Sequence, residues 1–340
     1  MGSTKKIGLM SVLFLLIGLS FTSFTSEAAE GNSLSYSVEA ELPNNQIKEV
    51  SYFYLSMTPA QEQTVYIRLS NHSNQEIKFN LTANTARTNS NGTIDYTDPA
   101  SKQDPSLIHS FSELVSIEPN LTVPAHETKK IPVVIKMPKE LFKGVILGGI
   151  HIQQLTKESD ENSKANLQIK NQFAHVIGMA LTESNELVQP NLNMHEIKQT
   201  VRDEHPIVTA NIQNNQAMYL EELEIETGIY SADNQLVTQK TTQNELKMAP
   251  NSNFDFMIPL NNQPLEPGEY KLIADAKSPN QKWHFEKKFK VLKNQKKAAD
   301  SASWSKKTKS TSLNYLWVVL VILFLVYFAF ILGRQTKKNS

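Results

Sequence analysis

Apolar side chains recur at every second position in short segments between residues 34 and 292, and this alternation constrains the fold more than any other feature of the sequence. A β-strand points successive side chains to opposite faces, so each segment is expected to bury one face and expose the other. Turn-forming Asn, Pro and Gly residues separate the segments, and together they predict an all-β fold of antiparallel sandwiches. The alternating positions are Val65, Ile67 and Leu69; Ile77, Phe79, Leu81 and Ala83; Ile131, Val133, Ile135 and Met137; Leu223 and Ile225; Phe254, Phe256 and Ile258; and Tyr270, Leu272 and Ala274.

The alternating region is longer than one typical domain and has room for two. A charged stretch from Thr156 to Lys170 interrupts it, and either a hairpin loop or a linker between domains fits this stretch. We therefore expect a first β-sandwich at residues 34–155 and a second at residues 171–292. The expected fold class is two immunoglobulin-like β-sandwich domains in tandem.

Two turn signatures support this fold class. Residues 265–270, Leu-Glu-Pro-Gly-Glu-Tyr, place a Pro-Gly turn just before a strand whose first inward residue is Tyr270. This arrangement resembles the tyrosine corner of immunoglobulin-like sandwiches, in which the phenol donates a hydrogen bond back to the backbone of the turn. Residues 124–127 predict a similar turn before the strand that contains Ile131.

The N-terminus has the plan of a secretory signal peptide. Lys5 and Lys6 precede an apolar run from Ile7 to Leu19, and Ser26-Glu27-Ala28 places small residues at both positions that a signal peptidase reads. The apolar run is shorter than the roughly 20 residues that cross a bilayer. We therefore expect a cleaved signal peptide at residues 1–28 instead of an N-terminal anchor.

The C-terminal region predicts one transmembrane helix. Residues 315–333 carry no charge, and they are long enough to cross about 30 Å of hydrocarbon as a helix. Arg334, Lys337 and Lys338 follow directly, which favours a cytoplasmic tail at residues 334–340. The expected product is a single-pass protein of the cell membrane, with its ectodomain outside on the cell-wall side and its C-terminus in the cytoplasm.

A Lys-rich segment at residues 293–312 precedes this helix. Lysines interspersed with Ala, Ser and Thr favour a solvated stalk. Contact of these lysines with anionic lipid headgroups or wall polymers is the alternative. No LPxTG motif precedes the helix, so the sequence does not indicate covalent attachment to the wall.

Composition narrows the class of protein further. The chain has no cysteine, which suits an exported Gram-positive protein and excludes thiolate metal sites and cysteine nucleophiles. Its 34 basic residues balance 34 acidic residues, so no excess of positive charge favours a nucleic-acid partner.

The sequence offers no catalytic, cofactor-binding or metal-binding constellation. The eight histidines are scattered, and His151 and His175 fall in predicted strands. Glu222, Glu224 and Glu226 are expected on the wet face of a strand. Residues 89–95 resemble a calcium loop only faintly, because they lack a distal bidentate Glu, and an Asn-Gly turn fits them better. We predict no enzyme activity and no cofactor, and the ligand-binding residues stay unknown.

Several short segments carry a family resemblance. In the first half they are residues 35–38 (SYSV), 42–46 (LPNNQ), 52–55 (YFYL) with Pro59, Gln63 and Asn71, and 144–150 (GVILGGI); in the second half they are residues 171–174 (NQFA), 176–179 (VIGM), 249–254 (APNSNF), 265–270 (LEPGEY) and 283–285 (WHF). The chain thereby resembles WxL-interacting proteins, which are cell-surface proteins of low-GC Gram-positive bacteria. The resemblance implies that the first domain binds peptidoglycan and that the second binds a WxL-domain surface protein or a host extracellular protein.

These observations favour a non-enzymatic scaffold, active in adhesion, that links membrane and peptidoglycan to a protein partner. A chaperone-like module that donates a strand to secreted surface proteins is the first alternative, because paired sandwiches are typical of pilus chaperones. A wall-active hydrolase is a second alternative, and only the expected location of the chain favours it.

Overall fold

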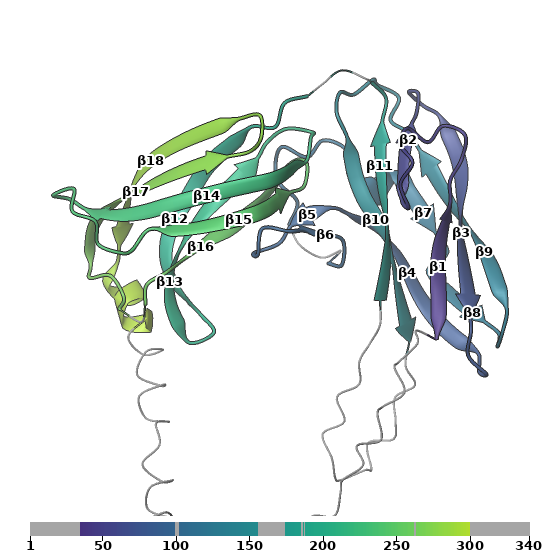
Figure 1. Ribbon diagram of the computed structural model, residues 1–340, viewed down its shortest axis with the longest axis horizontal. Coiled ribbons are helices and arrows are strands. Elements are labelled where there is room, and N and C mark those ends of the chain that lie inside the picture. The colour runs from purple at the N-terminus through teal and green to yellow at the C-terminus, as the bar shows by residue number, and fades with distance from the viewer. Residues whose placement is uncertain are drawn as a thin grey trace, which may run out of the picture.

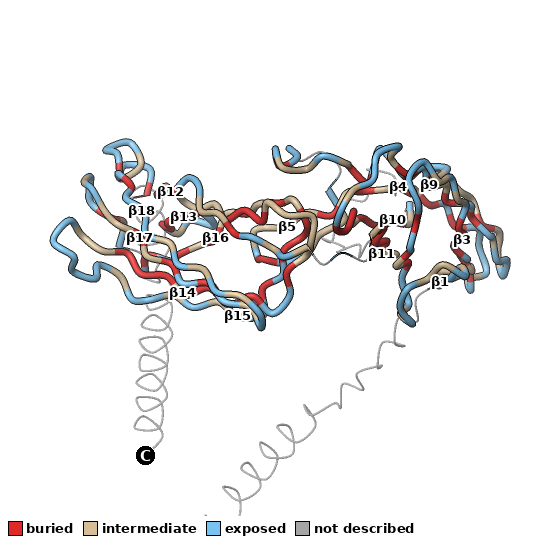
Figure 2. The backbone as a smooth tube through the Cα atoms, turned by 90° about the horizontal axis from the view of Figure 1, so that it is seen from above, coloured by how far each residue is buried: buried red, intermediate tan, exposed pale blue. Residues whose placement is uncertain are grey.

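A computed structural model describes residues 35–98, 102–155 and 174–299 of the chain, apart from residues 185, 187 and 262. The described chain forms two β-sandwiches that stand side by side (Figure 1). Buried residues follow the middle of each body, and exposed residues follow its outside (Figure 2). Each sandwich therefore has a hydrophobic core of its own.

The first sandwich packs a four-stranded sheet against a five-stranded sheet. The first sheet has the order β1 (Tyr36–Glu41), β3 (Glu62–Asn71), β9 (Thr128–Lys136) and β7 (Val115–Ile117). The second has the order β2 (Phe53–Ser56), β11 (Ala174–Thr182), β10 (Ile146–Leu155), β4 (Ile77–Thr85) and β8 (Asn120–Val123). Only the β2–β11 pair is parallel among these described strands. Phe53, Phe79 and Ile150 lie at the centre of the core and are fully buried.

The second sandwich packs a three-stranded sheet against a four-stranded sheet. The first has the order β12 (Leu192–Arg202), β13 (His205–Asn214) and β16 (Ser252–Pro259); the second has the order β15 (Thr241–Met248), β14 (Leu220–Ser231), β17 (Gly268–Lys277) and β18 (Lys282–Val291). All the pairs are antiparallel. Leu223, Phe256 and Leu272 are buried in its core.

Two small elements complete the first sandwich. A hairpin of β5 (Arg87–Thr88) and β6 (Ile94–Asp95) extends from the end of β4 toward the second sandwich, and Figure 1 shows it between the two bodies. A single helical turn, α2 (Phe111–Leu114), buries Phe111 against β10. Gly148 has no side chain where Phe111 packs, because a Cβ there would lie 2.1 Å from the Phe111 ring.

The structure confirms the all-β fold that the alternation predicts. Val65, Ile67 and Leu69 are all buried while their neighbours Tyr66 and Arg68 are exposed. The tyrosine corner is also confirmed, because the Tyr270 hydroxyl donates to the Glu266 carbonyl at 3.0 Å.

The division into sandwiches differs from the expected one at a single strand. β11 follows residue 171, the expected start of the second domain, yet it pairs with β10 and β2 of the first sandwich. The alternation identifies a strand but does not reveal its partners, which is why the sequence could not assign β11. The charged stretch before β11 therefore connects two strands of a hairpin, and the connection between the sandwiches is residues 183–191.

The expected signal peptide (1–28), transmembrane helix (315–333) and cytoplasmic tail (334–340) lie outside the described residues, so these stay predictions. Within the described ranges, no helix is both long and apolar enough to cross a membrane. The first residues of the expected stalk do not extend into solvent. Residues 293–299 form a short helix that packs against the second sandwich. Ala299 is buried there, and Lys296 Nζ lies 2.8 Å from Glu266 Oε1.

Candidate functional site

The junction between the two sandwiches holds the most distinctive surface features of the described chain. Two backbone hydrogen bonds cross it, from Val145 N to Ala217 O and from Lys247 N to Gly92 O, each at 2.7 Å. Gly144 is required here, because its φ is +96° and a Cβ would lie 2.1 Å from Ala217 O. The sandwiches are therefore joined by main-chain contacts as well as by the connecting segment.

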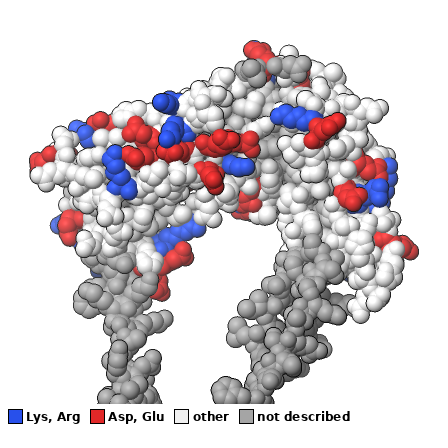
Figure 3. Space-filling model, in the orientation of Figure 1, with Lys and Arg blue, Asp and Glu red and all other residues white. Residues whose placement is uncertain are grey.

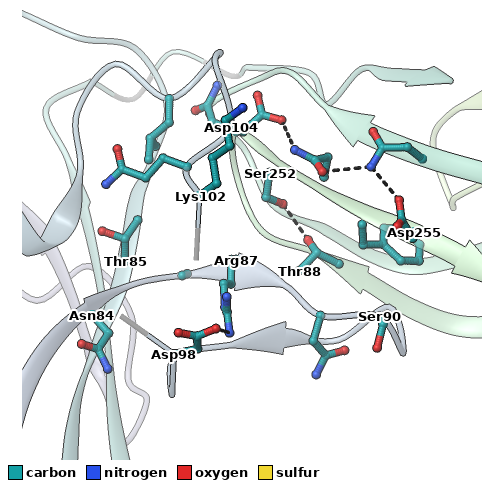
Figure 4. Close-up of a pocket in the computed structure, with 18 of the residues that line it drawn as sticks. Asn84, Thr85, Arg87, Thr88, Ser90, Asp98, Lys102, Asp104, Ser252 and Asp255 are labelled. Carbon is teal, nitrogen blue, oxygen red and sulfur yellow. Dashed lines mark hydrogen bonds and ion pairs between the residues drawn. The ribbon is translucent and has the colours of Figure 1, made fainter. Parts of the chain in front are cut away.

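A polar cleft of about 660 Å³ lies on one side of the junction (Figure 4). Asp104 of the first sandwich is buried and accepts hydrogen bonds from Gln213 Nε2, at 2.8 Å, and from Asn253 Nδ2. The Thr88 and Ser252 hydroxyls lie 2.6 Å apart, and Thr88 Oγ1 also accepts from the backbone N–H of Ala249 at 3.0 Å. Five side chains from the two sandwiches thus form hydrogen bonds with one another at the cleft.

The electrostatics of this cleft favour an ionised Asp104. Burial alone would raise the pKa of the Asp104 carboxyl, but hydrogen bonds from Ser106, Asn253 and Gln213 outweigh burial and lower that pKa below its usual value. Across the cleft, Arg87 pairs with Asp98 at 2.7 Å and with Asp95 at 3.3 Å. Figure 4 shows the hydrogen bond between Thr88 and Ser252, which crosses from the first sandwich to the second.

A second hollow, of about 360 Å³, opens at the same junction and has a different chemistry. Tyr52 and Tyr54 line it from the β2 edge of the first sandwich, Tyr96 from the end of β6, and Tyr219 from the start of β14 in the second sandwich. We call these four side chains, with the β11 backbone beneath them, the tyrosine pocket. Aliphatic side chains, among them Ile94, Leu147 and Val176, line the same hollow.

The tyrosine pocket exists because small residues face outward on β11 and β10. Gly178 and Ala180 form its floor, and the nearest atom to a Cβ on Gly178 would be Tyr52 Cβ at 3.7 Å. Gly149 lets the Tyr96 ring lie against the sheet, because a Cβ there would be 3.1 Å from Tyr96 Cδ1 and 2.8 Å from Val176 Cγ1. Larger side chains on these strands would fill the space.

Burial favours the neutral form of two phenols of the pocket, those of Tyr96 and Tyr219. Burial raises the pKa of Tyr96 to about 12, with a smaller contribution from the neighbouring Tyr52. Burial likewise raises the pKa of Tyr219 to about 12, with a smaller contribution from the neighbouring Tyr54. Lys48 Nζ lies 5.0 Å from the centre of the Tyr54 ring, which is a cation–π distance.

The acidic residues that the sequence singles out do not form a site. Glu224 and Glu226 share the outer face of β14 and form ion pairs with Lys277 and Lys240, at 2.8 and 2.6 Å. Charged side chains of both signs gather over this sandwich in Figure 3. Glu222 does not continue their alternation, because β14 has a register shift between Leu220 and Leu223 and Glu222 has a φ of +52°.

The remaining sequence candidates are structural. His151 lies in β10, where burial lowers its pKa and Asp95 partly offsets that effect, and His175 in β11 packs its ring against Tyr36 at 4.9 Å. Residues 89–95 form the predicted Asn-Gly turn, since Asn89 Oδ1 accepts from the backbone N–H of Asn91 at 3.0 Å. Among the described residues, no group of three His, Asp or Glu side chains could hold a metal ion.

Sequence reasoning missed the tyrosine pocket as a site. Its members come from four separated segments, so no local spacing indicates them. One signal was present: Tyr52 and Tyr54 flank the apolar Phe53 in an alternating segment, which places two aromatic rings on the face opposite the core.

The fold and the junction define a class of protein in which two β-sandwiches are fixed to one another, with an open aromatic pocket between them. Residues 36–154 match the family model described as "WxL Interacting Protein, peptidoglycan binding domain", and residues 164–301 match "WxL Interacting Protein, host binding domain". The chain belongs to the WxL-interacting protein family and contains both of its domains, as the sequence motifs indicated. Both family models describe binding domains.

Among solved structures, the chain is similar to the Pseudomonas aeruginosa CupB2 chaperone, at 12% identity and a TM-score of 0.28, over 68% of this chain and 95% of that one. It is also similar to the E. coli chaperone DraB, at 10% identity and a TM-score of 0.28, over 76% of this chain and 98% of that one. Scores this low carry no functional argument. No curated protein matches the sequence.

Proposed function

We propose that this protein is a non-enzymatic scaffold of the Gram-positive cell surface. Its first sandwich holds peptidoglycan, and its second sandwich holds a WxL-domain surface protein or a host extracellular protein. The two family models, one on each half of the described chain, support the two binding roles. Peptidoglycan and a protein partner are then linked through one polypeptide.

The proposal includes a place in the cell. Residues 1–28 act as the secretory signal, and residues 315–333 hold the protein in the membrane with the tail, 334–340, inside. Export and anchoring by one helix bring both sandwiches to the wall side of the membrane. The uncharged C-terminal run and the basic residues after it support this topology.

The junction is the observation that carries the linking role. Hydrogen bonds from Gln213 and Asn253 to Asp104, and main-chain contacts at Gly92 and Val145, connect the sandwiches at several separated points. A flexible pair of domains would let the two ligands move independently. A fixed pair holds a wall polymer and a protein partner at one distance, which is the property a scaffold needs.

Co-sedimentation tests the proposal. The full chain, in mild detergent, is mixed with purified Gram-positive sacculi, and in a second arm a purified WxL-domain protein is added. We expect the chain to pellet with sacculi and the WxL-domain protein to pellet only when the chain is present. If the chain stays in the supernatant and captures no WxL-domain or host protein in a direct binding assay, the proposed function is wrong.

A further inference from the structure

We infer that the tyrosine pocket is the binding site for the N-acetylated sugar rings of a peptidoglycan glycan strand. This inference rests on the proposed function and names the site and the part of the polymer that it recognises. It also assigns residues of both sandwiches, Tyr54 and Tyr219 among them, to one ligand.

The shape of the pocket suits a short polymer segment. Its volume of about 360 Å³ lies in the lower part of the range of small-ligand pockets, roughly 300–1,000 Å³. Gly178 and Ala180 place little side chain on the part of β11 that lines the pocket, and four tyrosines line it as well. Tyr52 is 37% exposed, so the hollow opens to the surface. A glycan chain can therefore lie across the pocket without its end having to enter first.

The lining matches neutral sugars better than charged polymers. A sugar ring offers an apolar face of C–H groups and a rim of hydroxyl and acetamido groups, and a tyrosine offers an apolar ring with one hydroxyl that both donates and accepts. Among the described lining residues, Glu221 is the one that carries a charge. A carboxylate there disfavours an anionic wall polymer.

The contact with the second sandwich completes the pocket. Tyr219 of the second sandwich and Tyr54 of β2 both line the pocket, so each sandwich supplies part of its wall. The floor belongs to β11, which is hydrogen-bonded into the first sandwich but lies beyond the residues matched by the peptidoglycan-binding family model, 36–154. Residues 36–154 alone thus provide only part of this site.

Two variants test the pocket directly. Gly178→Val fills the floor at a position where a Cβ meets no atom closer than 3.7 Å and where a strand tolerates a β-branched residue. Tyr54→Ala removes one wall. The matched control is Tyr66→Ala, which removes an exposed tyrosine of β3 whose ring also lies beneath a lysine, Lys130, at 4.0 Å. Circular dichroism and thermal unfolding verify that each variant is folded.

Binding is measured with the full chain against chitotetraose, a β-1,4-linked tetramer of N-acetylglucosamine, by calorimetry, and against sacculi by co-sedimentation. We expect wild type and Tyr66→Ala to bind both. We expect Gly178→Val and Tyr54→Ala to bind the tetramer at least about tenfold more weakly, a loss of about 1.4 kcal/mol, and to pellet less with sacculi.

The outcomes separate the two proposals. If both folded pocket variants bind sacculi and tetramer as wild type does, the pocket is not the site, although the proposed function stands. If they lose sacculi while even wild type fails to bind the tetramer, the pocket recognises another part of the sacculus and the glycan assignment is overturned. If they bind sacculi normally but lose a WxL-domain protein, the pocket serves a protein partner and the inference is again overturned. If wild type binds no sacculi, the peptidoglycan-binding part of the proposed function fails, and the glycan assignment fails with it.

Discussion

At the scale of single residues, burial and hydrogen bonding set the charge states at the junction. On one side, a ring of donors keeps the Asp104 carboxyl ionised although it is buried. On the other side, burial keeps the Tyr96 and Tyr219 phenols neutral. The stability of the junction is therefore expected to change at acidic pH through Asp104 and at alkaline pH through Tyr96 and Tyr219, and both changes can be measured.

Replacing Asp104 tests the acidic response. A carboxyl whose pKa falls on folding stabilises the folded state above its unfolded-state pKa of about 3.9, and this stabilisation is lost as the pH falls through the lowered value. Asp104→Asn removes charged hydrogen bonds to Gln213 and Asn253, so we expect a loss of roughly 1.5–3 kcal/mol in urea unfolding at neutral pH. Asp203→Asn, at a side chain that is 89% exposed, is the control. Equal unfolding midpoints for wild type and Asp104→Asn would contradict the role of Asp104.

The phenols give the alkaline prediction. Tyr96 and Tyr219 each have a pKa of about 12, against about 10 for an exposed tyrosine. Folding favours the neutral phenol, so its contribution to stability is complete below pH 10 and is lost as the pH rises through 12. Ultraviolet difference titration should show late-ionising tyrosines, and Tyr219→Phe should remove one of them. A titration in which every tyrosine ionises near pH 10 would show that the pocket is solvated.

At the scale of elements, the alternation predicts the strands well but does not predict their partners. Ile177, Met179 and Leu181 of β11 face the core of the first sandwich, in which β11 lies between β2 and β10. A local pattern cannot predict that pairing, because the partner residues in β2 lie more than 100 positions away in the sequence. The bulge at Glu222 and the tyrosine pocket were missed for the same reason, because both arise where separated segments meet.

The loop between β9 and β10 offers a test of how closely the elements fit at the junction. Gly144 has a φ of +96° and faces the Ala217 carbonyl. Gly144→Ala should therefore lower the free energy of unfolding, measured in urea, by more than about 1 kcal/mol. Gly268→Ala is the matched control, since a Cβ there meets no atom closer than 3.8 Å, and it should change stability by less than about 1 kcal/mol. If the two variants were equally stable, the loop would not be held against the second sandwich.

At the scale of the whole molecule, the junction makes one body out of two cores. Each sandwich has its own hydrophobic cluster, and polar and main-chain contacts connect them. Interfaces of this kind between domains often permit motion. Here the buried Asp104 raises the free energy that separation of the sandwiches requires, because separation would break its hydrogen bonds with Gln213 and Asn253. A scaffold that holds two ligands apart depends on this cost.

Distance measurements between the sandwiches test this rigidity. The chain has no cysteine, so Ser116→Cys on β7 and Lys288→Cys on β18 create the only two attachment sites for spin labels. We expect a single narrow distance distribution for the labelled chain at neutral pH. Adding Asp104→Asn and Gly144→Ala should broaden the distribution, because these changes remove a side-chain network and a main-chain fit at two separate points of the junction. A broad distribution in the labelled parent would mean that the sandwiches move freely and that any link between wall and partner is a flexible tether. Broadening only in the junction variants would mean that these contacts hold the two sandwiches rigid.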